Sequence, residues 1–319
     1  MPPEAGDALL GPGAPFELAT ELVSGRPHTV FLRRPRTLRQ ALAAQRAGEP
    51  DLPFLVSSDR GWTYREAVAD IEATVTLLTE RYAVGAGDRV AIVAANDAEY
   101  AILMWAVVTV GAVVTSLNGW WTAPELDYGI ALTTPKLVAG DARRLARLDG
   151  ASLPQGLPVR LFGELRAEAD EYRGRTPAPV DLPEDTPAVI VFTSGTTGRA
   201  KGATLSHRNI LNLTLVSRFR AAAAAAAAVP ATGSPGTGSP VAQPQDGMLV
   251  SSPLFHVSGV AGVFVTAAAT SSKLVFPPAG PWDPAVTMRL TAEHRITAWS
   301  GVPTQFWSSV KKLVANNSK

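Results

Sequence analysis

The sequence predicts an α/β protein in which layered, mostly parallel sheets are flanked by helices. From residue 54 onward, short apolar segments typical of strands alternate with segments that have helical caps and helical spacing. The strand segments are continuously apolar, which indicates sheets covered by helices on both faces. The chain has 319 residues, 46% of them hydrophobic and 18% charged, which allows ample core in one large domain or two medium ones.

The first fifty residues contain prolines and arginines without a regular pattern, and we expect an irregular arm that wraps the surface. Residues 54–56 predict a short strand. Thr63 and Glu66 then have the spacing of a reciprocal helix cap, and apolar residues recur at helical spacing after them. A helix is therefore expected to begin at this point.

Further strands and helices are expected before residue 140. Residues 89–93 and 112–115 predict strands, and Asn96 is placed to cap a helix between them. Thr122 repeats the cap pattern, with a proline near the helix start. Residues 136–139 predict the next strand.

The most informative segment follows the apolar run 188–192, which predicts a strand. It holds three glycines, four hydroxyl side chains and one lysine in ten residues: Thr193-Ser194-Gly195-Thr196-Thr197-Gly198-Arg199-Ala200-Lys201-Gly202. Glycines allow the backbone to approach an anion closely and to adopt positive φ, and the side chains add donors to the main-chain N–H groups. With a strand before it and a helix start after it, the segment predicts a loop that holds the phosphates of a nucleotide.

This segment is not the common Gly-x-x-x-x-Gly-Lys-Ser/Thr phosphate loop, since Ala200 precedes Lys201 and Gly202 follows it. The alternative is a flexible surface loop rich in glycine, serine and threonine. The flanking elements argue for phosphate binding instead.

We expect two subdomains, joined by the proline-rich, acidic segment 174–187. Residues 1–180 would form a first α/β subdomain with the irregular arm, and residues 181–319 an incomplete phosphate-loop subdomain. A helix is expected from His207, extended by a run of eight alanines. Residues 229–245 contain almost no large apolar side chain and predict a mobile surface loop.

Composition excludes several classes of function. The net charge of +1 gives no electrostatic case for nucleic acid or for an anionic membrane. Cysteine is absent, which excludes disulfides, thiolate metal sites and a cysteine nucleophile. The apolar run 101–117 is slightly short for a membrane span and is diluted by polar residues, so a buried helix passing into a strand is expected. The N-terminus lacks the pattern of a secretory signal, and we expect a cytoplasmic protein without a transmembrane segment.

The glycine-rich segment also resembles, position by position, the phosphate-loop signature of the adenylate-forming (acyl-CoA synthetase, AMP-binding) superfamily, where proline is usual at the position of Ala200. Other segments resemble further signatures of this family and extend the resemblance over most of the chain: residues 61–66, 111–118, 120–126, 206–209, 253–259 and 301–304. Residues 120–126 are most similar to fatty acyl-CoA synthetases. The resemblance implies the N-terminal domain of the adenylate-forming fold, truncated and without the C-terminal domain, since the family's later signatures have no counterpart here.

The resemblance implies ATP-dependent activation of a carboxylic acid, most similar to a fatty acid, through an acyl-adenylate. Thioester formation with coenzyme A as co-substrate would follow, with ATP and Mg²⁺ as cofactors. The binding partners would be these small molecules, and the sequence leaves open whether the protein forms a homo-oligomer. This chain alone is expected to be inactive as an enzyme. The alternatives are an aryl-acid:CoA ligase and a non-catalytic nucleotide- or acyl-binding module.

The resemblance also assigns roles to residues at matching positions. Lys201 is expected to act as a point charge on the departing pyrophosphate, and His256 to lie beside the acyl carboxylate and the phosphates. The alternatives are an exposed loop lysine and a structural histidine. Phosphate contacts are expected from Thr193, Ser194, Gly195, Thr196, Thr197, Gly198 and Lys201, with Thr196 also near Mg²⁺. Substrate contacts are expected from His256 and Gly259, and from Val302, Pro303 and Thr304 on a strand.

The substrate class is inferred from departures within the family. Amino-acid adenylating domains usually have an aspartate within the segment that reads Leu254-Phe255-His256 here, and fatty acyl-AMP ligases tend to have Asp-Met-Gly where this chain has Val257-Ser258-Gly259. A fatty or aryl carboxylate passed to coenzyme A is therefore favoured. Candidate walls of an apolar pocket, with core packing as their default role, are Val260, Val263, Phe264, Trp299, Val302 and Phe306. His207 is expected to serve helix geometry rather than catalysis.

Overall fold

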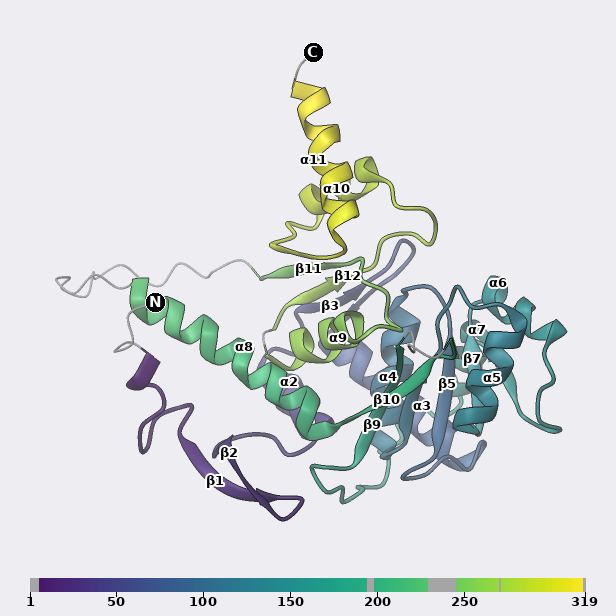
Figure 1. The fold of residues 1–319 in the computed structure, drawn as a ribbon, viewed down its shortest axis with the longest axis horizontal. Coiled ribbons are helices and arrows are strands. Elements are labelled where there is room, and N and C mark those ends of the chain that lie inside the picture. The colour runs from purple at the N-terminus through teal and green to yellow at the C-terminus, as the bar shows by residue number, and fades with distance from the viewer. Residues whose placement is uncertain (1–5, 194–197, 229–244, 270, 318–319) are drawn as a thin grey trace.

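The computed structural model describes residues 6–193, 198–228, 245–269 and 271–317. Strands in these residues form a two-stranded, a six-stranded and a five-stranded sheet (Figure 1). The fold class is the predicted one, with mostly parallel sheets and helices packed on them. The predicted loop at 229–245 lies outside the described residues except for Gln245.

The N-terminal region corrects the expectation of an irregular arm. Strands β1 (Leu18–Val23) and β2 (Arg26–Phe31) form an antiparallel hairpin, and helix α2 (Leu38–Gly48) follows. The two turn residues Ser24 and Gly25 both have positive φ, which matches the right-handed twist of a tight hairpin.

Arginine–carboxylate pairs tie this hairpin to the rest of the chain. The Arg34 guanidinium lies 2.6 Å from the Glu21 carboxylate of β1 and 2.7 Å from the Glu184 carboxylate, which belongs to the connection before strand β9 (Pro187–Thr193). Hydrogen bonds from Arg36 and Arg34 lower the pKa of Glu21 to about 2.

The six-stranded sheet has the order β10-β9-β6-β5-β7-β8. All its neighbouring strands are parallel except β9 and β10, which form an antiparallel hairpin. The strands are β5 (Arg89–Val93), β6 (Val113–Ser116), β7 (Leu137–Gly140), β8 (Val159–Leu161), β9 (Pro187–Thr193) and β10 (Lys201–Ser206).

The five-stranded sheet has the order β13-β11-β12-β3-β4 and is parallel except for the β3–β4 pair. Its strands are β3 (Pro53–Val56), β4 (Gly61–Thr63), β11 (Gly247–Val250), β12 (Lys273–Val275) and β13 (Ala298–Ser300). Both sheets combine strands from before and after residue 180. The predicted division at that residue therefore does not separate one sheet from the other.

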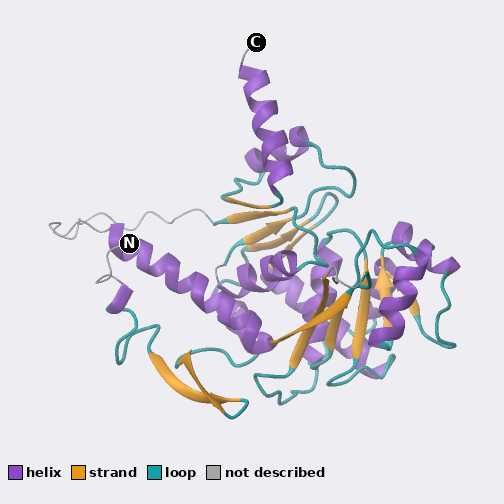
Figure 2. Ribbon diagram, viewed as in Figure 1, coloured by secondary structure: helices purple, strands orange, loops and turns teal. Residues whose placement is uncertain are grey.

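Helices cover both faces of the six-stranded sheet (Figure 2). On β5, Val90 and Ile92 belong to the large core shared with helices α3 (Tyr64–Glu80) and α4 (Ala98–Val110), whereas Ala91 and Val93 belong to a smaller core with α5 (Ala123–Thr133). Burial on both faces explains why this strand is continuously apolar. The helices after α2 are α3 (Tyr64–Glu80), α4 (Ala98–Val110), α5 (Ala123–Thr133), α6 (Ala142–Leu145), the 3₁₀ turn η1 (Ala146–Gly150), α7 (Phe162–Asp170), α8 (His207–Ala228), α9 (Val257–Ala269), α10 (Pro284–Glu293) and α11 (Pro303–Asn317).

The predicted caps are confirmed at two helices and wrong at one. Thr63 and Thr122 both form reciprocal capping boxes, with Glu66 and Glu125. Helix α4 is capped by Asp97 instead of Asn96, because the Asp97 side chain accepts the hydrogen bond from the Glu99 N–H. Asn96 is engaged elsewhere, as described below.

The apolar run 101–117 divides as expected into helix α4 and strand β6, separated by Gly111 at φ 84°. No helix in the described part of the chain combines the length and apolarity needed to cross a membrane.

The element after the glycine-rich segment differs from the prediction. Helix α8 begins at His207, which confirms the predicted start, but a second strand, β10, begins within the segment at Lys201 and precedes the helix. The segment is therefore the tip of a β-hairpin and does not open directly into a helix.

Candidate nucleotide and acid site

The carboxyl ends of the two large sheets face each other across a cleft of about 620 Å³. The residues that line it include Asn96, which follows strand β5, and Ser251, Pro253 and Phe255, which follow strand β11. The loop after β6 adds Trp120. A crevice outside the carboxyl ends of parallel strands is the usual ligand-binding position in open α/β sheets.

The glycine-rich segment lies on the hairpin at the same edge of the six-stranded sheet. Thr193 pairs with Lys201 across β9 and β10, and both residues are exposed. The Thr193 Oγ1 hydroxyl donates to the Lys201 carbonyl at 3.5 Å. Gly198 has φ 86°, which confirms the expected left-handed backbone. Of the predicted phosphate contacts, Ser194, Gly195, Thr196 and Thr197 lie outside the described residues.

Two neighbouring tryptophans link the hairpin to the loop that carries His256. The ring of Trp121 packs edge-to-face on Phe192, one residue before Thr193, with centroids 4.9 Å apart. The ring of Trp120 packs edge-to-face on Phe255, one residue before His256, at 5.1 Å. Both predicted catalytic residues therefore belong to segments that contact the loop after β6.

His256 is exposed and ends a tight turn before helix α9. Its N–H donates to the Pro253 carbonyl at 3.0 Å, and its own carbonyl accepts the Val260 N–H at 3.0 Å. The imidazole lies against Phe255, with ring centroids 5.1 Å apart. This histidine is therefore open to solvent, unlike the partly buried structural histidine that was the alternative from the sequence.

Gly259 is buried and has a packing role. A Cβ built at this position would lie 2.1 Å from the Pro253 carbonyl oxygen and 2.8 Å from the Leu254 Cα. The first turn of α9 thus rests directly on the backbone of the Pro253–His256 turn, which only glycine allows. The predicted substrate contact of Gly259 stays a prediction.

The predicted strand over residues 301–304 is wrong. Strand β13 ends at Ser300, and Pro303 is the first residue of α11. The Val302 N–H donates to the Gln305 Oε1 at 2.9 Å, and proline at the first helical position lacks an N–H that would need a partner. Val302 lines the cleft, whereas Pro303 and Thr304 form the exposed first turn of the helix.

Of the six residues predicted as candidate walls of an apolar pocket, some are core residues and one lines the cleft. Val260, Val263 and Phe264 are fully buried, and Phe264 packs edge-to-face on Trp105, so these three are core residues. Trp299 stacks on Phe306 at 5.8 Å. Val302 alone of the six candidates appears among the described residues that line the cleft.

His207 has the structural role expected of it. It is fully buried, its N–H donates to the Thr186 carbonyl, and its Nδ1 accepts the Leu38 N–H at 3.2 Å. Burial lowers its pKa to about 4, so the ring is neutral at physiological pH.

Sequence reasoning did not identify the residues that hold the cleft loops in place. These residues include Asn96 and two arginines, Arg144 and Arg147. Arg144 and Arg147 both donate to the Gly119 carbonyl, at 3.2 and 2.7 Å, and Arg147 also donates to the Trp121 carbonyl. Their partners are backbone carbonyls distant in sequence, so no local pattern indicates them.

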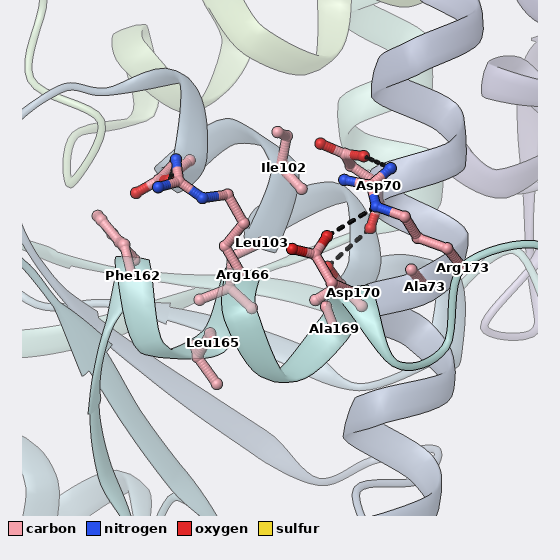
Figure 3. A pocket seen from close by; sticks show the side chains of 12 residues that line it. Asp70, Ala73, Ile102, Leu103, Phe162, Leu165, Arg166, Ala169, Asp170 and Arg173 are labelled. Carbon is pink, nitrogen blue, oxygen red and sulfur yellow. Dashed lines mark hydrogen bonds and ion pairs between the residues drawn. The ribbon is translucent and has the colours of Figure 1, made fainter.

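A smaller cavity of about 40 Å³ lies between helices α3, α4 and α7 (Figure 3). Asp70 is engaged there by Arg173 at 2.6 Å and by the Trp62 Nε1–H at 2.9 Å. A space of this size holds about one water molecule, and the charged side chains pair across it. We therefore assign it to helix packing.

Solved structures share the fold of this chain. A fatty acyl CoA synthetase of Mycobacterium tuberculosis matches with a TM-score of 0.71 and 21% identity, over 86% of this chain and 51% of that one. An inhibitor-bound N-terminal domain of FACL13 from the same organism also has a TM-score of 0.71, with 22% identity over 86% of this chain and 64% of that one. The fold is that of the N-terminal domain of adenylate-forming proteins.

The chain belongs to the AMP-binding enzyme family, whose model matches residues 42–317. A Mycobacterium tuberculosis 3-[(3aS,4S,7aS)-7a-methyl-1,5-dioxo-octahydro-1H-inden-4-yl]propanoyl:CoA ligase is 30% identical over 86% of this chain and 52% of its own length. The acyl-CoA ligase sidI of Beauveria bassiana is 28% identical over 77% of this chain and 42% of its own length. This chain spans about half, or less, of the length of the curated relatives that it matches.

Proposed function

We propose that this chain is the ATP- and acid-binding part of an enzyme that activates a carboxylic acid as an acyl-adenylate and then transfers the acyl group to coenzyme A. The observation that carries this proposal is the β9–β10 hairpin. Its strands place Lys201 opposite Thr193 at the carboxyl edge of the six-stranded sheet. The loop after β6 joins this edge to the cleft, since Trp121 packs on Phe192 and Trp120 lines the cleft. Family membership is consistent with this chemistry.

The proposed reaction has two steps. A carboxylate oxygen of the acid attacks the α-phosphorus of ATP, the bond to the β-phosphate oxygen breaks, and pyrophosphate leaves. The thiol of coenzyme A then loses its proton to solvent and attacks the acyl carbonyl, and AMP leaves with the bonding electron pair. The first step brings an anion to a polyanion, so donors fixed in advance around the phosphates lower its barrier.

The residues of the β9–β10 hairpin would stabilise the negative charge of the triphosphate. Lys201 would place a cation on the β- and γ-phosphates, with Thr193, Gly198 and the intervening residues 194–197 as hydrogen-bond donors. His256 would lie beside the acid, since Phe255 lines the cleft and His256 follows it in the turn. An exposed imidazole in this position can orient a carboxylate by donating a hydrogen bond.

Mg²⁺ would reduce the negative charge of the triphosphate. Within the described ranges, no group of three or more histidine and acidic side chains is arranged to hold a metal ion. In this proposal the phosphate oxygens of ATP would carry the magnesium ion, with the Thr196 hydroxyl, which lies outside the described residues, as the protein ligand. Coenzyme A remains the proposed co-substrate, and a cytoplasmic location and a homo-oligomer remain predictions.

For the acid, a fatty carboxylate is proposed first. The turn before α9 presents Leu254, Phe255 and His256, none of which would pair with the ammonium group of an amino acid. An aryl acid is the second candidate, because Trp120, Phe255 and Trp282 line the cleft and can stack on a flat ring. A 4-coumarate–CoA ligase of Oryza sativa is 31% identical over 55% of this chain.

We expect little turnover from these 319 residues alone, because the resemblance places a ribose-binding aspartate and a catalytic lysine in later signatures. In isolation the chain would then act as a nucleotide- and acid-binding module. Catalytic acyl-adenylate formation by the 319 residues alone would contradict this expectation.

The proposed function is tested by calorimetric titration of the chain with ATP and Mg²⁺. We expect binding, and we expect Lys201→Ala to weaken it by about tenfold or more, since a hydrogen bond to a charged group contributes about 1.5–3 kcal/mol. Lys311→Ala is the matched control, because Lys311 is an exposed lysine on α11 and should leave the affinity unchanged. The proposal fails if wild type gives no heat with nucleotide, or if both variants bind alike.

The acid is identified by thermal shift with ATP, Mg²⁺ and carboxylic acids of graded length. A shift that grows with alkyl chain length supports a fatty acid, whereas a shift limited to hydroxycinnamic or benzoic acids supports an aryl acid.

A further inference from the structure

Asn96 lies at the junction between the carboxyl edges of the two large sheets. It follows strand β5 of the six-stranded sheet, and its side chain is half-buried. Its Nδ2 donates to the Val250 carbonyl at 3.0 Å and to the Ser252 carbonyl at 2.8 Å, and its Oδ1 accepts the Leu254 N–H at 2.9 Å. All three partners belong to the segment that leaves β11 of the other sheet and leads to His256.

In these three hydrogen bonds, both the nitrogen and the oxygen of the Asn96 side-chain amide have backbone partners. An asparagine amide has two donor hydrogens and one acceptor oxygen with two lone pairs. Both donors and the acceptor are occupied here by Val250, Ser252 and Leu254, alternate residues of one segment that runs from the end of β11 into the turn before α9. No other standard side chain of this length offers two donors and an acceptor, so serine or aspartate cannot reproduce the set.

The same segment is fixed from two other sides. Helix α9 rests on Pro253 through Gly259, as shown by the 2.1 Å separation that a Cβ at Gly259 would have from the Pro253 oxygen. Trp120 packs on Phe255 from the loop after β6. Asn96 supplies the polar contacts, and it joins the wall of the cleft that carries His256 to the wall that carries the hairpin strands.

We propose that Asn96 is a positioning residue that sets the separation and register of the two cleft walls, and so places His256 relative to the bound acid and nucleotide. This inference rests on the proposed function for its ligands, but the placement of the turn can be measured without them. Asn96 itself does not touch the reacting atoms in this proposal; it acts through the backbone of residues 250–254.

The test compares Asn96→Asp with Gln245→Glu. Gln245 is a matched control because its Nε2 also donates to two backbone carbonyls, of Pro53 and Ser271 at 2.7 and 2.6 Å, away from the cleft. Both substitutions remove two donated hydrogen bonds and add one negative charge. Asn96→Ser, which adds no charge, serves if Asn96→Asp fails to fold.

The first readout is an NMR spectrum of the chain with isotope label at the Cε1 atom of its histidines. The chain has four histidines. Asn96→Asp is expected to move the His256 resonance and to leave those of His28 and His294 in place. Gln245→Glu is expected to leave the His256 resonance unchanged, although it lowers the melting temperature by a similar amount. An unmoved His256 resonance in Asn96→Asp and Asn96→Ser overturns the proposal, as does an equal movement in Gln245→Glu.

The second readout is the affinity for an acyl sulfamoyl-adenosine, a non-reactive mimic of the acyl-adenylate. We expect a loss of about tenfold or more in Asn96→Asp and less than about twofold in Gln245→Glu. Equal affinities in wild type and Asn96→Asp overturn the proposal. If wild type does not bind the mimic, the proposed function fails, and the NMR comparison still decides whether Asn96 positions the turn.

Discussion

The two segments that would meet the reactants have different neighbours in the sequence. The glycine-rich segment lies between β9 and β10, which pair residue by residue from Lys201 with Thr193 down to Leu205 with Val189. The Pro253–His256 turn is held by Gly259 of the following helix and by Asn96 and Trp120, which are distant in the chain. The strands beside the first segment are therefore close in sequence, whereas the second segment depends on residues more than a hundred positions away.

This contrast separates two kinds of functional loop. A hairpin tip keeps its conformation as long as its two strands pair, so its residues are free to serve a ligand. A turn held from several sides moves when any of its neighbours changes. We therefore expect substitutions around the Pro253–His256 turn to disturb both folding and binding, and substitutions at the hairpin tip to disturb mainly binding.

The largest expected effect is that of Gly259→Ala. The new methyl group would overlap the Pro253 carbonyl, and because backbone cannot move aside cheaply, we expect a loss of about 3 kcal/mol or more in the free energy of unfolding. Urea unfolding measures it. Gly262→Ala on the same helix is the control, since its methyl group would lie 3.6 Å from the Met248 sulfur, and we expect a neutral or slightly stabilising change. Equal stability of the two variants would mean that α9 does not rest on the turn.

The next effect concerns the base of the hairpin, where His207 joins the end of β10 to Leu38. Its pKa is lowered from 6.5 to about 4, so the unfolded chain binds more protons between these pH values. Stability is thus expected to fall as pH drops from about 6.5 to 4, by up to about 3 kcal/mol, and to change no further from this group below pH 4.

Chemical denaturation across this pH range checks the prediction, with His207→Asn as the reference. Asparagine retains an acceptor for the Leu38 N–H but does not titrate, which isolates the histidine from the carboxylates. Parallel stability curves for wild type and His207→Asn would show that His207 does not contribute.

The smallest expected effect on stability is that of Gly198→Ala at the hairpin tip. Gly198 has positive φ and, among the residues that the structure describes, no atom within 4 Å of a built Cβ, so we expect a cost from backbone strain of about 1 kcal/mol. Gly156→Ala has the same strain and the same open surroundings, and we expect an equal loss of stability. Only Gly198→Ala should weaken ATP binding in a calorimetric titration. If both variants bind ATP like wild type, the hairpin tip does not need the left-handed glycine to hold phosphate.

Much of the fold was predictable from local pattern. The strands at residues 54–56, 89–93 and 136–139 have apolar runs of the right length, and the two capping boxes place their helices to the residue. The N-terminal hairpin was missed although Ser24 and Gly25 provide a two-residue turn signal, because β1 has no fully buried position and the first four residues of β2 are all exposed, which leaves no clear apolar alternation.

The site was predictable only in part, for the same reason that distinguishes its two loops. The glycine-rich segment has its chemistry within ten consecutive residues, so the sequence indicates it directly. Asn96 and Asp97 are both good capping residues, and no local rule decides between them. The structure assigns the cap to Asp97 because Asn96 is engaged by a segment more than a hundred residues later.

The pairing of β3 with β12 has a consequence for how the molecule is made. Leu55 lies opposite Leu274, so an early strand of the five-stranded sheet meets its parallel neighbour only after most of the chain has left the ribosome. Until then the edge of β3 is available to any other extended segment, including the same strand of another nascent copy. The five-stranded sheet, whose strand β11 leads to His256, therefore cannot be complete before β12 and β13 are available, and we expect production yield to depend on the speed of translation and on chaperones as well as on the final stability of the protein.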